Sequence, residues 1–200
     1  MRGVYGAKKK TSKPPPEPFQ KLELGWTGRG ELPTVTTYEL LDSRFELLGK
    51  SLYCGMYINE LLVRLVNRSE PNMPLFALYE STLRDLTGTN VEIEQVLRRF
   101  EKYLLEICGY GLLLDCEADS GVAIDPAASY FYQFEHGPVR EQSANKELDI
   151  SGITLLKFAN DEPLDKAGLR QTKRLMRQAL SHYLGDKPLL SRSLFEQTSN

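Results

Sequence analysis

The chain is poor in the residues that mark secreted, membrane-spanning or catalytic proteins. Its three cysteines, Cys54, Cys108 and Cys116, are odd in number and lack paired spacing, which excludes a disulfide scaffold and indicates a reducing compartment. It has two histidines, His136 and His182, and its sequence contains neither a GxSxG motif nor a phosphate-binding glycine loop. No apolar segment is long enough to span a bilayer, and the N-terminus lacks the apolar core of a signal peptide. We therefore expect a cytoplasmic protein that is not an enzyme and has no membrane partner.

The chain also lacks an excess of either charge. Its 25 Lys and Arg residues stand against 27 Asp and Glu residues, a net charge of −2 over 200 residues. This balance excludes a uniformly basic protein, so nucleic-acid binding would depend on local patches. Residues 1–30 hold seven Lys or Arg against two Glu, a local charge of +5, which leaves −7 for the remainder. The hydrophobic fraction of 41% is ordinary for a globular protein.

Residues 1–42 are expected to form a small β unit. A strand-like piece around Val4 precedes a basic loop with four prolines, which cannot donate hydrogen bonds to a sheet. Two runs rich in β-formers, KLELGW and TVTTYEL, then flank the turn sequence TGRGELP. Two or three strands bury too little apolar surface to be stable alone, so the unit looks incomplete.

Helical patterns dominate from Leu47 onward. The apolar spacing predicts a mostly buried helix to about Leu65, a second helix with Pro74 in its first turn and Gly88 near its end, and a third that stops at Gly109. In the second helix we expect Leu75, Phe76, Leu78, Tyr79, Leu83 and Leu86 to face inward. The third carries an apolar stripe of Ile93, Val96, Leu97, Phe100, Leu104 and Ile107. Three consecutive helices with short connections indicate a bundle.

The rest of the chain is mixed. Residues 112–150 are turn-rich and predict a loop plus a small hairpin around Tyr130–Phe134. The run ITLLKFA predicts a short apolar helix, and Asp165 opens a longer one to about Leu184. The expected fold class is therefore α+β, mainly α: a partial β unit at 1–42, then a helical domain at 43–200 with a loop and hairpin insertion at 112–150.

Two basic groups are candidates for binding phosphates. The first comprises Lys8, Lys9, Lys10, Lys13, Trp26 and Arg29; the second comprises Arg170, Lys173, Arg174 and Arg177. Mobile ammonium groups can follow a nucleic-acid backbone, and a tryptophan can stack on bases. The second group lies at i, i+3, i+4 and i+7 on one helical face, where cations repel one another unless an anion meets them. A solvated tail, a core tryptophan and a solvated helical face are the alternative interpretations.

Three motifs carry a resemblance to a known family. They are LYCGMYINELL (Leu52–Leu62), LRRFE with the downstream GYG (Leu97–Gly111), and YLGDKPLLSRSLF (Tyr183–Phe195), preceded by GAKKK and WTGRGEL. In this order and spacing they resemble the bacterial recombination mediator family RecO. The resemblance implies an N-terminal OB-fold, a helical domain, and neither a catalytic site nor a nucleotide cofactor. It further implies binding of single- and double-stranded DNA, strand annealing, and nucleoid association in the cytoplasm.

The resemblance also implies protein partners. RecO-like proteins bind the acidic C-terminal tail of the single-stranded-DNA-binding protein and act with RecR to load RecA at gaps. We expect Arg98, Arg99 and Lys102 to bind that tail, because an arginine beside an apolar groove suits an acidic peptide with an apolar end. On this hypothesis Arg98→Ala weakens tail binding at least tenfold with little change in melting temperature. The alternative is an ion pair of Arg98 with Glu94 or Glu101 in the same helix.

The chain departs from the family pattern in two places. Met1 stands where a third OB strand should be under way, so the barrel looks truncated. Some relatives hold zinc through two cysteine pairs, whereas here Cys116 is followed only by Asp119, and the HGPVREQSANK segment lacks the second pair. We therefore expect neither zinc nor any other cofactor. A helical adaptor that binds proteins without contacting DNA is the competing functional hypothesis.

Overall fold

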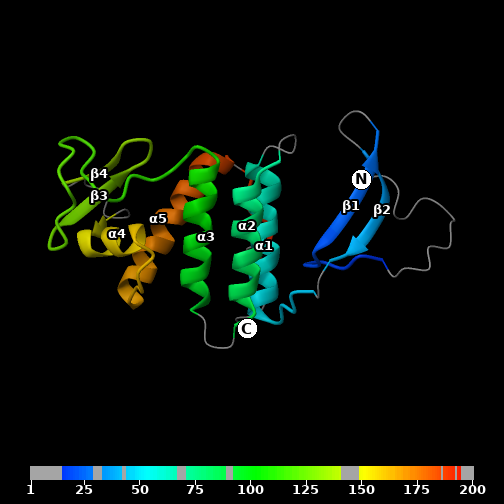
Figure 1. The fold of residues 1–200 in the computed structure, drawn as a ribbon. Coiled ribbons are helices and arrows are strands. Elements are labelled where there is room, and N and C mark those ends of the chain that lie inside the picture. The colour runs from blue at the N-terminus through cyan, green and yellow to red at the C-terminus, as the bar shows by residue number, and fades with distance from the viewer. Residues whose placement is uncertain are drawn as a thin grey trace. The chain divides into compact units, whose positions relative to one another are not determined.

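The computed structural model describes residues 15–28, 33–41, 44–66, 71–88, 92–140, 149–185, 187–191 and 193–194. The chain divides into two compact units, Met1–Leu47 and Leu48–Asn200, whose helices and strands are labelled in Figure 1. The predicted strand around Val4, the lysines of the basic loop and Arg29 lie outside the described residues.

The first unit contains the antiparallel pair of strands β1 (Leu22–Thr27) and β2 (Thr34–Leu40). Both strands were predicted, and both are confirmed. The register places Leu24 opposite Tyr38 and Trp26 opposite Val35, so one face of the hairpin is apolar. Trp26 is 66% exposed, which excludes a core position for it within the described structure. The assignment of this unit to a partial OB-like barrel stays a prediction.

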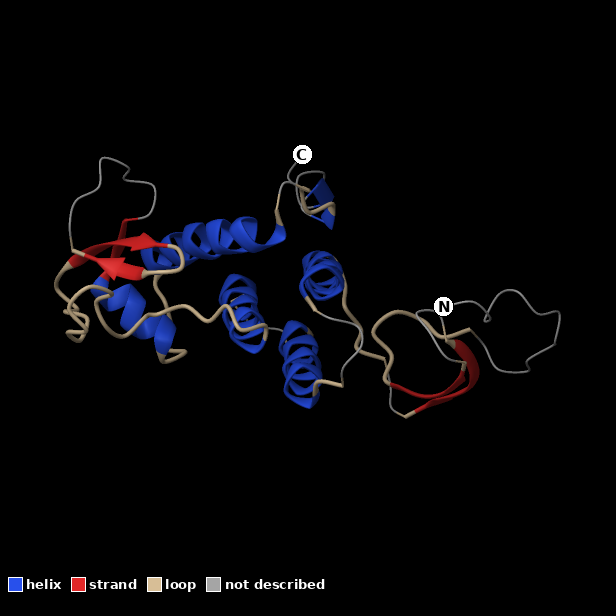
Figure 2. Ribbon diagram, turned by 90° about the horizontal axis from the view of Figure 1, so that it is seen from above, coloured by secondary structure: helices blue, strands red, loops and turns tan. Residues whose placement is uncertain are grey.

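The second unit is organised around helix α3 (Ile93–Ile107), which contacts α1 (Lys50–Leu65), α2 (Met73–Leu86) and α5 (Lys166–Leu184). Figure 2 looks almost along the axes of α1, α2 and α3. The largest fully buried side chains come from all of these helices and include Ile58, Leu61, Leu83, Phe100, Leu104, Leu105, Leu175, Met176 and Leu180. The predicted mainly α architecture and its helical bundle are confirmed.

Local sequence explains where these helices begin and end. The side chain of Asn72 accepts a hydrogen bond from the Leu75 amide at 2.9 Å, and Pro74 follows in the first turn of α2. Asp165 caps α5 in the same way through the Gly168 amide at 2.7 Å. Gly109 follows α3 with a φ of +85°, a left-handed conformation that costs a glycine little.

The insertion forms a small sheet rather than a lone hairpin. Strands β3 (Ser129–Gln133) and β4 (Gly137–Val139) make the predicted hairpin, but β5 (Asp149–Ser151) pairs with the other edge of β3. Sequence analysis missed β5 because three residues are too few to show an alternating pattern. Helix α4 (Gly152–Ala159) follows directly and was predicted from its apolar run.

One prediction about burial is wrong: Phe76 was expected to face the core but is 48% exposed. Helix α1 was expected to be buried on most sides, and most of its residues are buried or half-buried, although Met56 is 42% and Val63 is 60% exposed. Among the described residues, no helix combines the length and the apolar character that a bilayer crossing requires.

Two of the sequence motifs meet at α1. Glu60 accepts hydrogen bonds from the amides of Leu190 and Ser191 at 2.9 and 2.8 Å and from the Ser191 hydroxyl at 2.6 Å. One turn later, Arg64 donates to the carbonyl oxygens of Leu184 and Pro188. The C-terminal segment, which we define as residues 187–191, is therefore held to α1 by side chains of both signs.

This contact predicts a pH dependence. Burial alone would raise the pKa of Glu60, but the hydrogen bonds from Ser191 and Leu190 and the nearby Arg64 outweigh it and hold the pKa below its ordinary value. The contact should thus be intact above the unfolded-state pKa, roughly 4.3, and weaken as pH falls through the lower folded-state pKa. The protection factors of the Leu190 and Ser191 amides against hydrogen exchange should fall on acidification. Glu60→Gln should give fast exchange at every pH, whereas the control Glu80→Gln should behave as wild type.

Candidate functional site

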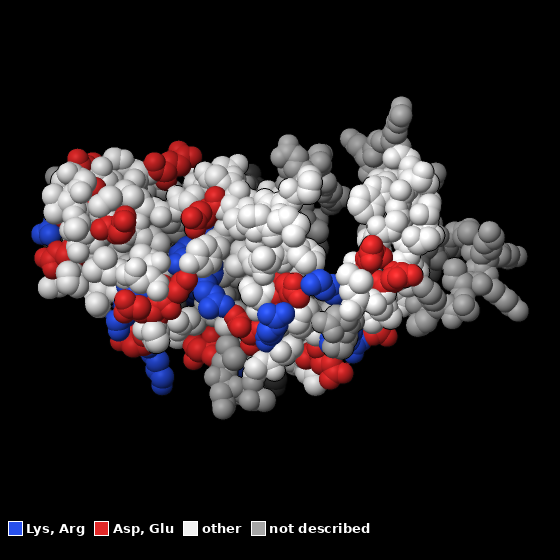
Figure 3. Space-filling model, viewed as in Figure 1, with Lys and Arg blue, Asp and Glu red and all other residues white. Residues whose placement is uncertain are grey.

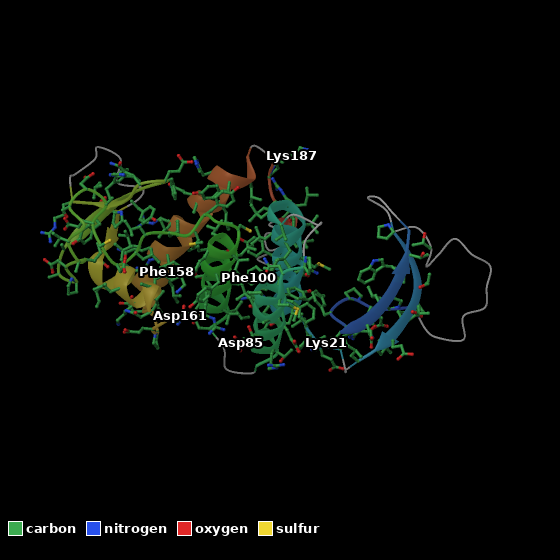
Figure 4. All side chains as sticks on the ribbon, turned by 45° about the horizontal axis from the view of Figure 1, so that its top comes forward. Lys21, Asp85, Phe100, Phe158, Asp161 and Lys187 are labelled. Atoms are coloured by element: carbon green, nitrogen blue, oxygen red, sulfur yellow. The ribbon has the colours of Figure 1, made fainter. Side chains whose placement is uncertain are left out.

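A cavity of about 350 Å³ opens beside the N-terminal half of α3, between the end of α2 and the α4–α5 loop. Its apolar wall comprises Val96, Phe158 and Leu164. Arg98 and Arg99 also line it, so the paired arginines of the LRRFE motif border a cavity with an apolar wall. Figure 4 labels Asp85 and Asp161 at the same end of the helical unit, with Lys187 at the opposite end.

Arg98 is part of a buried polar network. Its side chain is 9% exposed, and Nη2 lies 2.8 Å from Oε1 of Glu101, which is completely buried. The hydroxyl of Tyr57 donates to the same carboxylate oxygen at 2.6 Å. Among the described residues, Nε of Arg98 is buried without a hydrogen-bond partner. The intrahelical pair that sequence analysis kept as the alternative for Arg98 is therefore present, although Arg98 also lines the cavity.

Lys102 caps the C-terminal end of α4. Its ammonium group donates to the carbonyl oxygens of Phe158 and Ala159 at 2.8 and 3.0 Å and to Oδ1 of Asp161 at 2.7 Å. An ammonium group has three donors, so its hydrogen-bonding capacity is used in full. The two carbonyls belong to the last turn of α4, where a cation is favourable. Lys102 thus fixes the α4–α5 loop and has no donor left for a partner.

Asp161 is shared between two residues of α3. While Oδ1 pairs with Lys102, Oδ2 accepts a hydrogen bond from the Tyr103 hydroxyl at 2.5 Å. That hydrogen bond, together with burial, raises the pKa of Tyr103 to about 12. The phenol therefore remains a neutral donor at physiological pH. Local sequence carries no trace of these contacts, because Asp161 lies 58 and 59 positions from Tyr103 and Lys102.

Arg99 is the exposed cation of the cavity. It forms an ion pair with Asp85 of α2, and the two side chains are 39% and 38% exposed. Each of the three cations predicted to bind a partner tail therefore has a carboxylate beside it: Glu101 for Arg98, Asp85 for Arg99 and Asp161 for Lys102. Figure 3 shows the same mixture, with Lys and Arg side chains lying among Asp and Glu over the lower half of the helical unit.

The basic face of α5, which we define as Arg170, Lys173, Arg174 and Arg177, is a separate surface. All four residues are exposed, while Leu169, Thr172, Leu175 and Met176 face the core. Lys173 pairs with Glu94 at 2.5 Å, and Arg174 approaches the Asp149 carbonyl oxygen at 3.4 Å. For Arg170 and Arg177, the described part of the chain supplies no carboxylate partner. A shallow depression of about 400 Å³ runs along Arg170, Lys173 and Arg174.

The region around Cys116 and His136, where some relatives are expected to hold zinc, is held together here by a hydrogen bond and an ion pair. His136 Nε2 lies 2.7 Å from Oδ1 of Asp119, and Arg140 pairs with Glu117 at 2.5 Å. Across the described ranges, no group of three or more His, Cys, Asp or Glu side chains is arranged to hold a metal ion. Burial raises the pKa of Cys116, which keeps this thiol protonated.

Comparison with known proteins gives a consistent result. The family model described as "Recombination protein O C terminal" matches residues 49–193. The "DNA repair protein RecO" of Nitrosospira multiformis is 42% identical over 181 residues, covering 90% of this chain and 74% of that protein. The protein of the same name from Nitrosococcus oceani is 43% identical over 182 residues, with the same coverage. That of Alkalilimnicola ehrlichii is 44% identical over 184 residues, covering 90% and 72%.

Proposed function

The chain belongs to the RecO family, and on that basis we propose that it is a DNA repair protein that binds DNA through the basic face of α5. The observation that carries the proposal is the exposure of four cations on one helical face, two of which have no carboxylate partner among the described residues. Exposed guanidinium groups favour an anion such as phosphate. Seven residues of helix separate Arg170 from Arg177, about 10 Å, which is long enough to contact more than one phosphate.

The same proposal extends to the wider role of the family. The chain would anneal complementary strands, bind the tail of the single-stranded-DNA-binding protein at the cavity beside α3, and act with RecR to load RecA. Arg99 is the cation best placed for the tail, since it is exposed at the cavity, and Val96, Phe158 and Leu164 offer an apolar surface. Catalysis plays no part in this mechanism, because annealing and loading require only binding.

A salt titration tests DNA binding by α5. In Arg170→Gln/Arg177→Gln, the negative slope of log K against log salt for a single-stranded oligonucleotide should become shallower by about 1.4, since each lost phosphate contact removes roughly 0.7. Affinity at low salt should fall about tenfold or more. The control Lys50→Gln/Arg84→Gln removes the same charge from α1 and α2 and should change the slope little.

The other outcomes rank the remaining hypotheses. An unchanged slope in the α5 variant, together with a reduced slope in Lys8→Ala/Lys9→Ala/Lys10→Ala, would place the main DNA contact on the N-terminal loop. If the wild-type chain showed no salt-dependent binding at all, the adaptor hypothesis would replace the proposal.

A further inference from the structure

Asp85 occupies a position that helix stability does not explain. It lies in the last turn of α2, where the partial negative charge of the helix C-terminus disfavours a carboxylate. The backbone amides of Thr87 and Gly88 already bond to carbonyl oxygens of this turn, so the Asp85 side chain is not needed to end the helix. The cation that compensates it is Arg99, across the cavity beside α3.

Arg99 is also the only one of the three neighbouring cations whose carboxylate partner is readily displaced. The partner of Arg98 is completely buried, and Lys102 is fixed by two carbonyls as well as by Asp161. Arg99 and Asp85 are both more than one third exposed, and such pairs contribute little to stability, about 0–1 kcal/mol. An incoming carboxylate can therefore exchange with Asp85 at Arg99 without disturbing the core.

We infer that Asp85 is an internal competitor that sets the affinity of this cavity for an anionic peptide. In the free protein the Asp85 carboxylate is paired with the Arg99 guanidinium group, to which a carboxylate of the ligand would bind. This inference rests on the proposed binding of an acidic tail at the cavity. It adds that the ligand must displace Asp85 before Arg99 can bind it.

The surrounding charges narrow the class of ligand. Asp85, Glu92, Asp161 and Glu162 line the cavity with Arg98 and Arg99, four carboxylates against two guanidinium groups. A long polyanion would be repelled by this excess of negative charge. The cavity thus suits a short peptide end with few carboxylates, whose apolar side chains contact Val96, Phe158 and Leu164.

The test is a fluorescence-anisotropy titration of the full chain with a labelled peptide that ends in a single aspartate followed by leucine and phenylalanine. Asp85→Asn should bind this peptide about twofold to fivefold more tightly than wild type, since a competing ion pair is removed. Arg99→Ala should bind it more weakly, and adding Asp85→Asn to Arg99→Ala should give no gain. Glu80→Gln is the matched control, because it removes an equal charge from the same helix beside Arg84, and it should leave affinity unchanged.

The outcomes separate this inference from the proposed function. Wild-type binding with equal or weaker binding by Asp85→Asn overturns the inference and leaves tail binding at the cavity in place. Binding by neither protein overturns both. The melting temperature of Asp85→Asn, expected within about 2 °C of wild type, shows that any gain does not come from a change in folding.

Discussion

Replacing Lys102 with methionine is expected to lower the free energy of unfolding of the helical unit by about 3 kcal/mol or more. The substitution keeps the length of the side chain but removes all three of its hydrogen bonds. The carbonyl oxygens of Phe158 and Ala159 lose their donor, and among the described residues Asp161 keeps the Tyr103 hydroxyl as its side-chain donor. Leaving a buried acceptor such as the Phe158 carbonyl oxygen without its donor typically costs about 1–3 kcal/mol, and the lost ion pair with Asp161, whose side chain is 30% exposed, adds less.

Thermal unfolding followed by circular dichroism measures this effect. A loss of about 3 kcal/mol corresponds to a fall in melting temperature of about 6–12 °C for a unit of this size. Lys166→Met, which removes an exposed cation at the start of α5, should change the melting temperature by less than about 2 °C. Equal melting temperatures for both variants would show that Lys102 does not stabilise the α4–α5 loop.

The second large effect is expected for Arg98→Ala, which should also destabilise the helical unit by about 3 kcal/mol. The variant leaves the carboxylate of Glu101 completely buried without the guanidinium group that pairs with it, although the Tyr57 hydroxyl still donates to Oε1. This expectation differs from the one drawn from the sequence, in which Arg98→Ala changes the melting temperature little. The change follows from the burial of Arg98, which the sequence did not predict.

A double-mutant cycle tests the explanation. If the cost arises from the unpaired charge, Arg98→Ala/Glu101→Gln should be clearly more stable than Arg98→Ala alone, because a neutral amide is cheaper to bury than a carboxylate. Additive losses would instead assign the effect to lost packing around the arginine side chain. Peptide binding by any Arg98 variant must be compared at temperatures where the variant is folded.

The sequence predicted those features that depend on neighbouring residues. The apolar stripe of α3, the start of α5 after Asp165, the stop at Gly109 and the β1–β2 hairpin follow from periodicity and turn chemistry, and all are present. The separation of the basic face of α5 from the core was predicted in the same way and is confirmed. DNA binding by that face stays a prediction.

Features that depend on distant residues could not be predicted. Lys102 was predicted, with Arg98 and Arg99, to bind a partner tail, yet its acceptors lie 56 to 59 positions away in α4 and the loop after it. Asp85 and Arg99 come from different helices, and only their packing brings them together. No periodicity encodes such contacts, so the charge compensation of the cavity could be found only in the fold.

The contact of Glu60 with Ser191 has a consequence for synthesis on the ribosome. The two residues are 131 positions apart, so at about 5–20 residues per second Glu60 waits roughly 7–26 s before its partner is translated. During that time the surface of α1 around Glu60, which later binds the C-terminal segment, is open to chaperones and to neighbouring nascent chains. The helical unit can therefore complete its fold only after nearly all of it has left the exit tunnel.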